Sequence, residues 1–264
     1  MPAPASYIKL SRLAPLEISG TDACAFLHGQ ITGDLHELDR RGWMFSAWCL
    51  ANGRVISTFI LYRHDAALVL LVPAALKEKV RRQLSLFVLR AAVTIRDASD
   101  DLALLGIVGG SAGTGDYFAS ARRQGRLLTT EACALLEYPE TTPRSLLVCR
   151  PSRAGPMLDA IRGNCPRQEE SAWDILDLEA GYAWLTEQTS GEFLPQMLHL
   201  EALRGLSYDK GCYPGQEIIA RLHYRGQLKR RLMLGLGHGE HLPDPGTGLV
   251  QPGSEAVSGM VIQD

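Results

Sequence analysis

The sequence of 264 residues lacks the features that define several classes of protein. No segment approaches the about 20 consecutive apolar residues that a membrane-spanning helix needs, and the chain does not begin with a basic region followed by an apolar stretch. We therefore expect no membrane attachment and a cytoplasmic location. The formal charge is only −2, from 27 basic and 29 acidic side chains, so any affinity for nucleic acid must come from a local patch.

The cysteines are few and scattered, and none forms a C-x-x-C pair. This spacing argues against a zinc site and against an iron–sulfur cluster held by the chain alone. We expect reduced thiols, five of them small core residues, and no metal bound stably by the isolated chain. The cysteines are Cys24, Cys49, Cys133, Cys149, Cys165 and Cys212.

A nucleotide-binding loop is also missing. The glycine-rich segment GGSAGTG, residues 109–115, follows an expected strand, but it has neither the Lys-Ser/Thr pair of a P-loop nor the G-x-G-x-x-G spacing. We interpret it as a turn.

What the chain does contain is a series of strands with helices laid on them, which predicts an α+β fold. An Asn-Gly turn at Asn52–Gly53 is expected to join two strands of the first module. We expect a first module at 1–98, a second at 99–205, and a third region at 206–264 with short strands. Strands are predicted at 13–20, 44–50, 54–63 and 65–73, and helices at 74–89, near 117–124, at 156–163 and at 171–181, where Gly181 is expected to end the helix.

The helix that begins at Ser171 carries a carboxylate on an apolar face. At about 100° per residue, Ala172, Ile175, Leu176 and Glu179 share that face. A carboxylate in apolar surroundings takes up a proton or finds donors, so Glu179 needs a partner. The partner is either an arginine elsewhere in the fold or a ligand edge with two adjacent N–H groups, as in a 2-amino-4-oxo-pyrimidine. Trp173 either stacks on such a ligand or joins the core.

The stretch DKGCYPGQE, residues 209–217, presents one cysteine on a turn. A Pro-Gly pair favours a type II turn, and a short helix is expected to follow. Cys212 would then lie near a helix N-terminus with Lys210 close by, and both influences favour the thiolate. A cysteine hydrolase would need His199 or His223 as a base, and nothing in the sequence brings these residues together with the thiol.

The run RLHYRGQLKRR, residues 221–231, carries five basic residues and no acid, with Tyr224 among them. Such a run can bind the phosphates of RNA or an anionic ligand tail, or it can be a solvated surface. The basic residues are Arg221, Arg225, Lys229, Arg230 and Arg231.

Together these motifs resemble the YgfZ family of folate-binding proteins, relatives of the aminomethyltransferase T-protein of glycine cleavage. The likeness covers nearly the whole chain and rests on KGCYPGQE followed by IIAR and YRG, and on FLHGQITGDL, ANGR, ILDLEAGY and EFLPQ. It implies α+β folate-binding domains in a cloverleaf around a central channel that holds tetrahydrofolate, with a small C-terminal β-barrel. It also implies an accessory role in iron–sulfur cluster assembly or repair, including for enzymes that thiolate tRNA.

The resemblance also implies roles for single residues. Glu179 would grip the pterin, Trp173 would take part in folate binding, and Gln30 and Asp34 of FLHGQITGDL are further candidates for the cofactor site. Cys212 would be the reactive thiol of the signature loop. That loop comprises Lys210, Gly211, Cys212, Tyr213, Gly215, Gln216 and Glu217.

Three positions depart from the family pattern. Where T-proteins carry a catalytic aspartate, this chain, aligned on Gly53, has Ser57 and Thr58, which weakens the case for aminomethyl transfer. An aromatic residue that some relatives use near the N-terminus is Leu13 here. The chain ends at VSGMVIQD, where the barrel of the family would continue, so we expect an incomplete barrel.

Three functions therefore stay open at the level of sequence. The first is a monomeric tetrahydrofolate-binding accessory protein whose partners are iron–sulfur enzymes or assembly proteins. The second is a tetrahydrofolate-dependent one-carbon transferase in which another acid, such as Asp34, replaces the missing aspartate. The third is a module that binds tRNA weakly through residues 221–231.

Overall fold

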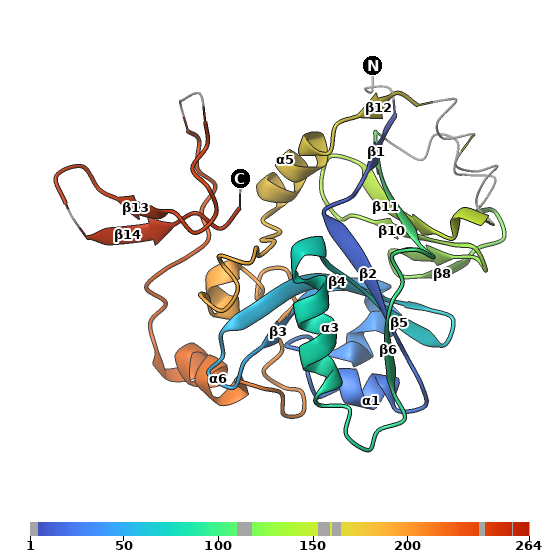
Figure 1. The fold of residues 1–264 in the computed structure, drawn as a ribbon, viewed down its shortest axis with the longest axis horizontal. Helices are drawn as coiled ribbons and strands as arrows, with labels where there is room; N and C mark the ends of the chain where they lie inside the picture. Colours follow the sequence, from blue (N-terminus) through green and yellow to red (C-terminus); the bar gives the residue numbers. More distant parts are fainter. Residues whose placement is uncertain are drawn as a thin grey trace.

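The computed structural model describes residues 5–109, 118–152, 159, 165–237, 241–254 and 256–263. The expected turn at 109–115 and the expected helix at 156–163 lie largely outside these residues. The described part contains a five-stranded sheet, a seven-stranded sheet and a two-stranded sheet, with helices packed against them (Figure 1). This arrangement confirms a fold of mixed sheets and helices.

The five-stranded sheet is antiparallel throughout and has the order β3-β4-β5-β2-β6. The predicted Asn-Gly turn joins β3 to β4, and Gly53 adopts the left-handed conformation with φ of 78°. The strands are β2 (Leu13–Ser19), β3 (Trp43–Cys49), β4 (Val55–His64), β5 (Ala67–Pro73) and β6 (Thr94–Asp97). Nearly every residue of β3, β4 and β5 is buried, because helices and the second sheet cover both faces.

Three α-helices and two 3-10 helices accompany this sheet. The helix expected at 74–89 is shorter in the structure, since it ends at Ser85, and Leu89 beyond it is exposed with a φ of 43°. Val80 and Leu84 are its buried residues. The elements are α1 (Ala23–His28), η1 (Leu35–Glu37), α2 (Leu38–Arg41), η2 (Ala74–Leu76) and α3 (Lys77–Ser85).

The seven-stranded sheet has the order β12-β1-β7-β11-β10-β9-β8, in which the N-terminal strand β1 lies between β12 and β7. Its strands are β1 (Ser6–Lys9), β7 (Ala103–Val108), β8 (Arg122–Gln124), β9 (Leu127–Thr129), β10 (Cys133–Glu137), β11 (Arg144–Cys149) and β12 (Arg167–Gln168). The helix expected near 117–124 is wrong at its C-terminal end, because Arg122–Gln124 pairs with β9 across a turn at Gly125. The chain therefore crosses from one sheet to the other between β1 and β2.

The two faces of the second sheet contact two different clusters of apolar side chains. Leu136 and Leu146 belong to the large core that the second sheet shares with the first sheet, whereas Leu135 and Leu147 belong to a smaller cluster on the opposite face. Neighbouring residues of a strand point to opposite faces, so both faces of β10 and β11 are apolar.

The helix α5 (Ser171–Ala180) lies across the inner face of the second sheet. It ends at Gly181, as the sequence predicted, because this glycine takes the left-handed conformation. Trp173 is fully buried, and its ring lies on the backbone of Gly106 in β7, where any side chain would occupy the same space.

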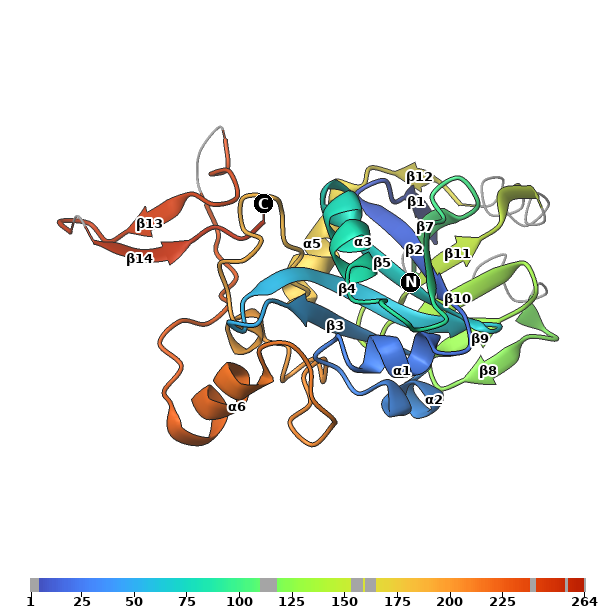
Figure 2. The same ribbon diagram turned by 60° about the horizontal axis from the view of Figure 1, so that its bottom comes forward.

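The C-terminal region comprises η4 (Pro195–Leu198), α6 (Gln216–Arg225), β13 (Gly248–Val250) and β14 (Val257–Met260). The pair β13 and β14 projects from the body of the molecule (Figures 1 and 2). Among the described residues after α6, this pair is the only sheet, so no closed barrel forms there. The cloverleaf arrangement and the division into modules at 98 and 205 stay predictions.

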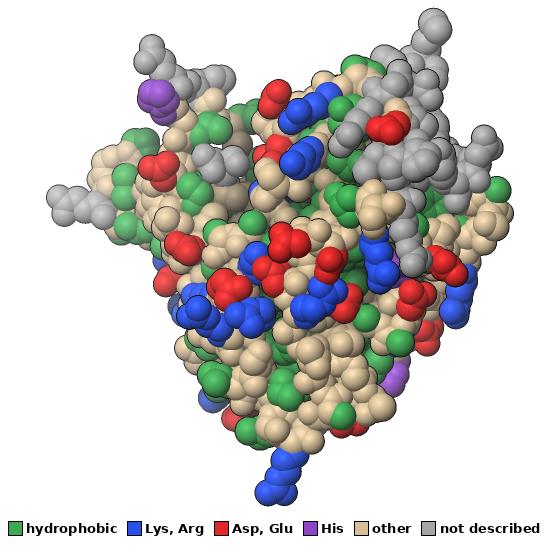
Figure 3. Space-filling view, turned by 45° about the vertical axis from the view of Figure 1, so that its right-hand side comes forward, with side chains coloured by type: hydrophobic (Ala, Val, Ile, Leu, Met, Phe, Trp, Pro, Cys, Tyr) green, Lys and Arg blue, Asp and Glu red, His purple; other side chains and the backbone are tan. Residues whose placement is uncertain are grey.

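Two surface properties agree with the composition. No helix among the described residues is long and apolar enough to cross a membrane. On the face shown in Figure 3, blue and red side chains are interspersed, as a formal charge of −2 leads one to expect.

Trp173 packs so closely on Gly106 that a methyl group added at position 106 should lower the stability of the fold. A Cβ at position 106 would lie 2.4 Å from Cε3 of Trp173, and the buried ring has no room to move. We expect Gly106→Ala to lower the free energy of unfolding by about 1 to 3 kcal/mol, the usual cost of overpacking, in urea titrations followed by circular dichroism. Gly211→Ala is the control, because nothing lies within 4 Å of the added Cβ. Equal stability of the two variants would contradict the packing.

Candidate functional site

The signature loop lies where four of the sequence motifs meet. Gly215 has φ of 81°, and a Cβ on it would lie 2.5 Å from Cα of Gly53 in the turn between β3 and β4. Only glycine allows this approach. We call the region formed by residues 28–36, 50–54, 192–196 and 207–219 the signature junction.

Lys210 fastens the signature loop to the segment after α1. Its Nζ donates hydrogen bonds to the carbonyl oxygens of Ile31 at 2.9 Å and Gly33 at 2.8 Å, and to that of His28. Burial lowers the pKa of Lys210 to about 8, and nearby Asp34 acts in the opposite direction. An ammonium group has three donors, so none remains to hydrogen-bond the Cys212 thiolate, although the sequence had led us to expect Lys210 to favour that thiolate.

Gln196 joins the EFLPQ motif to α6. Its side chain is buried, and Nε2 donates to the carbonyl oxygen of Ile219 at 2.7 Å. On the other side of this segment, Arg54 of the ANGR motif donates to the carbonyl oxygen of Glu192. Residues from distant parts of the chain thus hold one another through backbone carbonyl groups.

The signature residues divide into anchors and exposed groups. Tyr213 is buried and donates from its hydroxyl to the carbonyl oxygen of Ser207 at 3.2 Å, and Gln216 is half-buried. Cys212 and Glu217 are exposed, with open space around Gly211 between the anchors. Cys212 therefore faces solvent four residues before α6 begins.

The remaining cysteines are mostly core residues, as expected. Cys49, Cys133, Cys149 and Cys165 are buried, while Cys24 is half-buried and accepts a hydrogen bond from Arg63 at 3.2 Å.

Three polar side chains gather at one edge of the signature junction. Nδ1 of His28 lies 3.7 Å from Oδ1 of Asp34, and the rings of His28 and His36 are 4.9 Å apart. Burial, followed by the charge of Lys210, lowers the pKa of His28, against the opposing effect of Asp34. Gln30, in the same segment, is half-buried with Oε1 lacking a partner among the described residues. The sequence pointed to Asp34 and Gln30 as candidates for the cofactor site, but it did not point to either histidine.

The prediction of a buried Glu179 is wrong. Glu179 is exposed, and Ile175 on the same face is 56% exposed. The buried face of α5 is instead that of Trp173 and Asp177, both fully buried. The apolar side chains of the expected face are not decisive, because the second sheet offers Gly106 for Trp173 and Arg144 for Asp177, and the segment between β1 and β2 adds Arg12.

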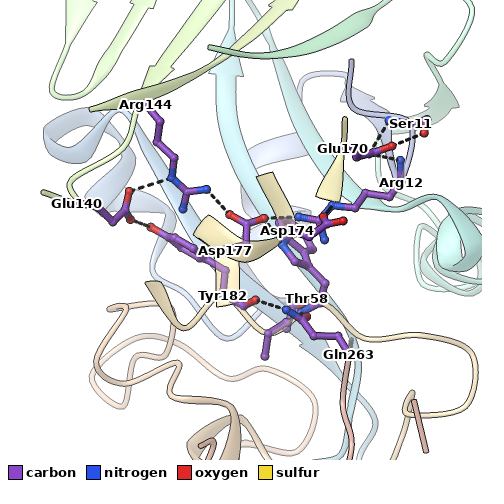
Figure 4. A network of polar contacts seen from close by, with 12 residues as sticks. Ser11, Arg12, Thr58, Glu140, Arg144, Glu170, Asp174, Asp177, Tyr182 and Gln263 are labelled. Atoms are coloured by element: carbon purple, nitrogen blue, oxygen red, sulfur yellow. Dashed lines mark hydrogen bonds and ion pairs between the residues drawn. The ribbon is translucent and has the colours of Figure 1, made fainter. Parts of the chain in front are cut away.

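Asp177 is the buried carboxylate of this helix, and it is fully paired (Figure 4). Its Oδ1 accepts from Arg144 at 2.7 Å, and its Oδ2 accepts from the indole of Trp184 at 2.8 Å and from Arg12. Desolvation acts to lower the pKa of Arg144, but Asp177 and its neighbours raise it overall. The buried acid of α5 is therefore Asp177 with internal arginine partners, whereas the sequence had led us to expect an arginine or a ligand as the partner of Glu179.

The N-terminal end of α5 also binds the segment between β1 and β2, where the chain crosses from one sheet to the other. Glu170 accepts from the backbone N–H groups of Ser11 at 2.7 Å and Arg12 at 2.9 Å, and Asp174 pairs with Nε of Arg12 at 2.6 Å. Beyond Arg144, Glu140 accepts from the hydroxyl of Tyr182 at 2.9 Å. The network is therefore a structural link between α5, the crossing segment and the second sheet (Figure 4).

Trp173 has no free ring face for a ligand. The guanidinium carbon of Arg144 lies 4.7 Å from its ring centroid, Tyr138 packs edge-on at 5.4 Å, and Gly106 covers the ring from the sheet. The interpretation of Trp173 as a stacking platform is corrected to a core residue.

The positions that depart from the family pattern are also buried. Ser57 and Thr58 are fully buried, and the Thr58 hydroxyl donates to the carbonyl oxygen of Ala183 at 2.7 Å. Leu13 begins β2 and is buried. No carboxylate occupies the position expected for the catalytic acid of T-proteins.

The basic run is accessible along its length. A depression of about 420 Å³ follows one face of α6 and is lined by Glu217, Ala220, Arg221, Tyr224 and Arg225. The predicted basic residues Arg221, Arg225, Lys229, Arg230 and Arg231 are all exposed.

Similarity to known proteins shows the class of fold to which the chain belongs. Residues 4–114 match the family model described as the GCVT N-terminal domain. The structure resembles the glycine cleavage system aminomethyltransferase T from Bartonella henselae with a TM-score of 0.68, over 85% of this chain and 64% of that one, at 16% sequence identity. The chain thus has a GCVT-like aminomethyltransferase fold.

Curated relatives then define the family. The chain is 31% identical over 246 residues to the tRNA-modifying protein YgfZ of Cronobacter sakazakii, covering 92% of this chain and 74% of the relative. It is 33% identical over 249 residues to the protein of the same name from Klebsiella pneumoniae, covering 93% and 76%. The chain belongs to the YgfZ family.

The paired carboxylate of α5 leads to a stability prediction. Asp177→Asn keeps the shape of the side chain but removes the buried charge that faces Arg144, whose side chain is 1% exposed and then pairs only with Glu140, 3.3 Å away, among the described acids. We expect the free energy of unfolding to fall by about 3 to 5 kcal/mol, measured by urea denaturation. Glu179→Gln, on the exposed face of the same helix, should change it by less than about 0.5 kcal/mol. Similar losses in both variants would refute the assignment of the buried pair.

Proposed function

We propose that this protein binds tetrahydrofolate and acts as an accessory factor for iron–sulfur enzymes that modify tRNA. One observation carries the proposal: the motifs FLHGQITGDL, ANGR, EFLPQ and KGCYPGQE, spread over nearly 200 residues, meet at the signature junction of a GCVT-like fold. We include folate binding in the proposal because the chain belongs to this family. The curated relatives are named as tRNA-modifying proteins, which supports the place of action.

In this role Cys212 supplies a thiol that a partner protein can reach. The thiol is exposed, and the loop is anchored on both sides by Lys210 and Tyr213, so the backbone holds it outward. One thiolate cannot hold a cluster alone. We therefore assign Cys212 transient thiol chemistry, or one ligand of a cluster whose other ligands come from an iron–sulfur partner.

Binding without aminomethyl transfer is favoured over the one-carbon transferase. A transferase needs an acid at the reacting carbon, and the hydroxyl groups of Ser57 and Thr58 are buried and directed to backbone carbonyl oxygens. Asp34, the substitute acid considered above, accepts a hydrogen bond from the backbone N–H of His36 at 2.9 Å. This contact gives it a structural task.

The folate proposal is tested by titrating tetrahydrofolate into wild type and Glu179→Ala under anaerobic conditions, with affinity measured by calorimetry. If Glu179 accepts the N–H groups of the pterin, its removal should cost about 1.5 kcal/mol, roughly tenfold in affinity. The expected cost is smaller than for a buried acid because Glu179 is exposed. Glu187→Ala, another exposed acid beyond α5, is the matched control and should bind like wild type. Wild type that takes up no tetrahydrofolate would refute folate binding, and equal affinities would move the pterin site away from Glu179.

A weak contact with tRNA is the second candidate, favoured by the exposed basic residues and Tyr224 along the depression on α6. Counterion release predicts a slope of about −0.7 in log K against log salt for each phosphate contacted on a single strand. We expect Arg221→Ala/Arg225→Ala to reduce the steepness of this slope by about 1.4 in fluorescence anisotropy with tRNA. Arg122→Ala on β8 should leave it unchanged. Absence of binding even at low ionic strength would eliminate this candidate.

A further inference from the structure

The segment that follows α1 brings together two imidazoles and a carboxylate. The ligand atoms of His28, Asp34 and His36 all lie within 4.8 Å of one another. His28 is the last residue of α1, Asp34 precedes η1, and His36 lies within η1, so a turn of only nine residues places the three side chains. His28 and Asp34 are half-buried and His36 is exposed, which leaves the group open to solvent on one side.

Hydrogen bonds to the backbone hold the ligand atoms near one another. Nδ1 of His28 lies 3.7 Å from Oδ1 of Asp34 and accepts a long hydrogen bond of 3.3 Å from the backbone N–H of Leu35, so this nitrogen is unprotonated. A metal ion at Nδ1 would displace this hydrogen bond, because an imidazole nitrogen has one lone pair. Oδ1 of Asp34 is fixed by the N–H of His36 at 2.9 Å. An unprotonated imidazole nitrogen and a carboxylate oxygen are both metal-ligand atoms.

Among the described residues, no lysine or arginine neutralises the carboxylate of Asp34. Lys210 lies close by, but its three donors are taken by the carbonyl oxygens of His28, Ile31 and Gly33. Within the described part of the chain, no lysine or arginine forms an ion pair with Asp34. Lys210 instead holds the backbone of the turn in place from behind, which preorganises the three side chains without neutralising the acid.

We propose that His28, Asp34 and His36 bind a divalent first-row transition metal ion such as Zn²⁺ or Fe²⁺. Two imidazoles with one carboxylate suit these ions, and three protein ligands leave coordination positions open for water or a further ligand. The site does not depend on folate. The site contains no thiol, so the spacing of the cysteines does not bear on it. The proposal departs from the expectation that the isolated chain binds no metal stably, because that expectation considered only the cysteines.

The test uses untagged protein freed of metal with a chelator, in the absence of folate. Zn²⁺ is titrated by calorimetry, and Co²⁺ is titrated in parallel because its visible absorption reports nitrogen and oxygen coordination. We expect one equivalent of metal per chain. His36→Ala removes a ligand on the exposed side, and Asp34→Asn removes the charge while an amide oxygen can still accept from the N–H of His36.

Each of these variants should bind Zn²⁺ at least about tenfold more weakly than wild type, because loss of a direct ligand costs no less than loss of a supporting partner. Thermal unfolding in the absence of metal verifies that the variants fold. His241→Ala, an exposed histidine of the C-terminal region, and Cys212→Ser are the controls and should bind like wild type. No binding by wild type, unchanged binding by His36→Ala, or an equal loss in either control would overturn the proposal.

Discussion

The ammonium group of Lys210 is the contact on which the signature junction depends. It lies among three carbonyl oxygens of the segment after α1, about 180 residues away in the chain, and so joins the signature loop to the first sheet. A buried charge is stable only where it is well solvated by fixed dipoles, and these carbonyl groups serve that purpose. The same contact sets the turn that carries His28, Asp34 and His36, and it leaves Cys212 facing solvent. One side chain thus organises an anchor, a candidate metal site and an exposed thiol.

A second polar centre, around Asp177, has a different task. It links α5 to the crossing between the sheets, and its carboxylate is satisfied by Arg12, Arg144 and Trp184. A carboxylate that is fully buried among these donors is not open to a ligand. The support for folate binding therefore comes from family membership, because Glu179 is exposed and does not need a ligand as its partner.

The motifs of the sequence act mainly as joints between segments. Gly53 and Gly215 allow two turns to touch, Gln196 ties a loop to α6, and Tyr213 anchors the loop beside Cys212. Such residues would be restricted in any protein with this fold, whether or not they touch a ligand. The groups that remain free to react or bind are fewer: the thiol of Cys212, the carboxylate of Glu179, the side chains of the turn after α1 and the basic residues of α6.

By itself, the sequence determined the local elements whose signals act over a few residues. The strands from β2 to β5, the Asn-Gly turn, α6 and the glycine-rich bend at Cys212 all follow from alternation, turn preference and spacing. Only the tertiary structure decided which face of α5 is buried, because that depends on Gly106, Arg12 and Arg144, which lie far from the helix in sequence. It also decided that Lys210 binds carbonyl oxygens and that two histidines join Asp34. Long-range partners determine the environment of a charge, and no periodicity within one segment contains that information.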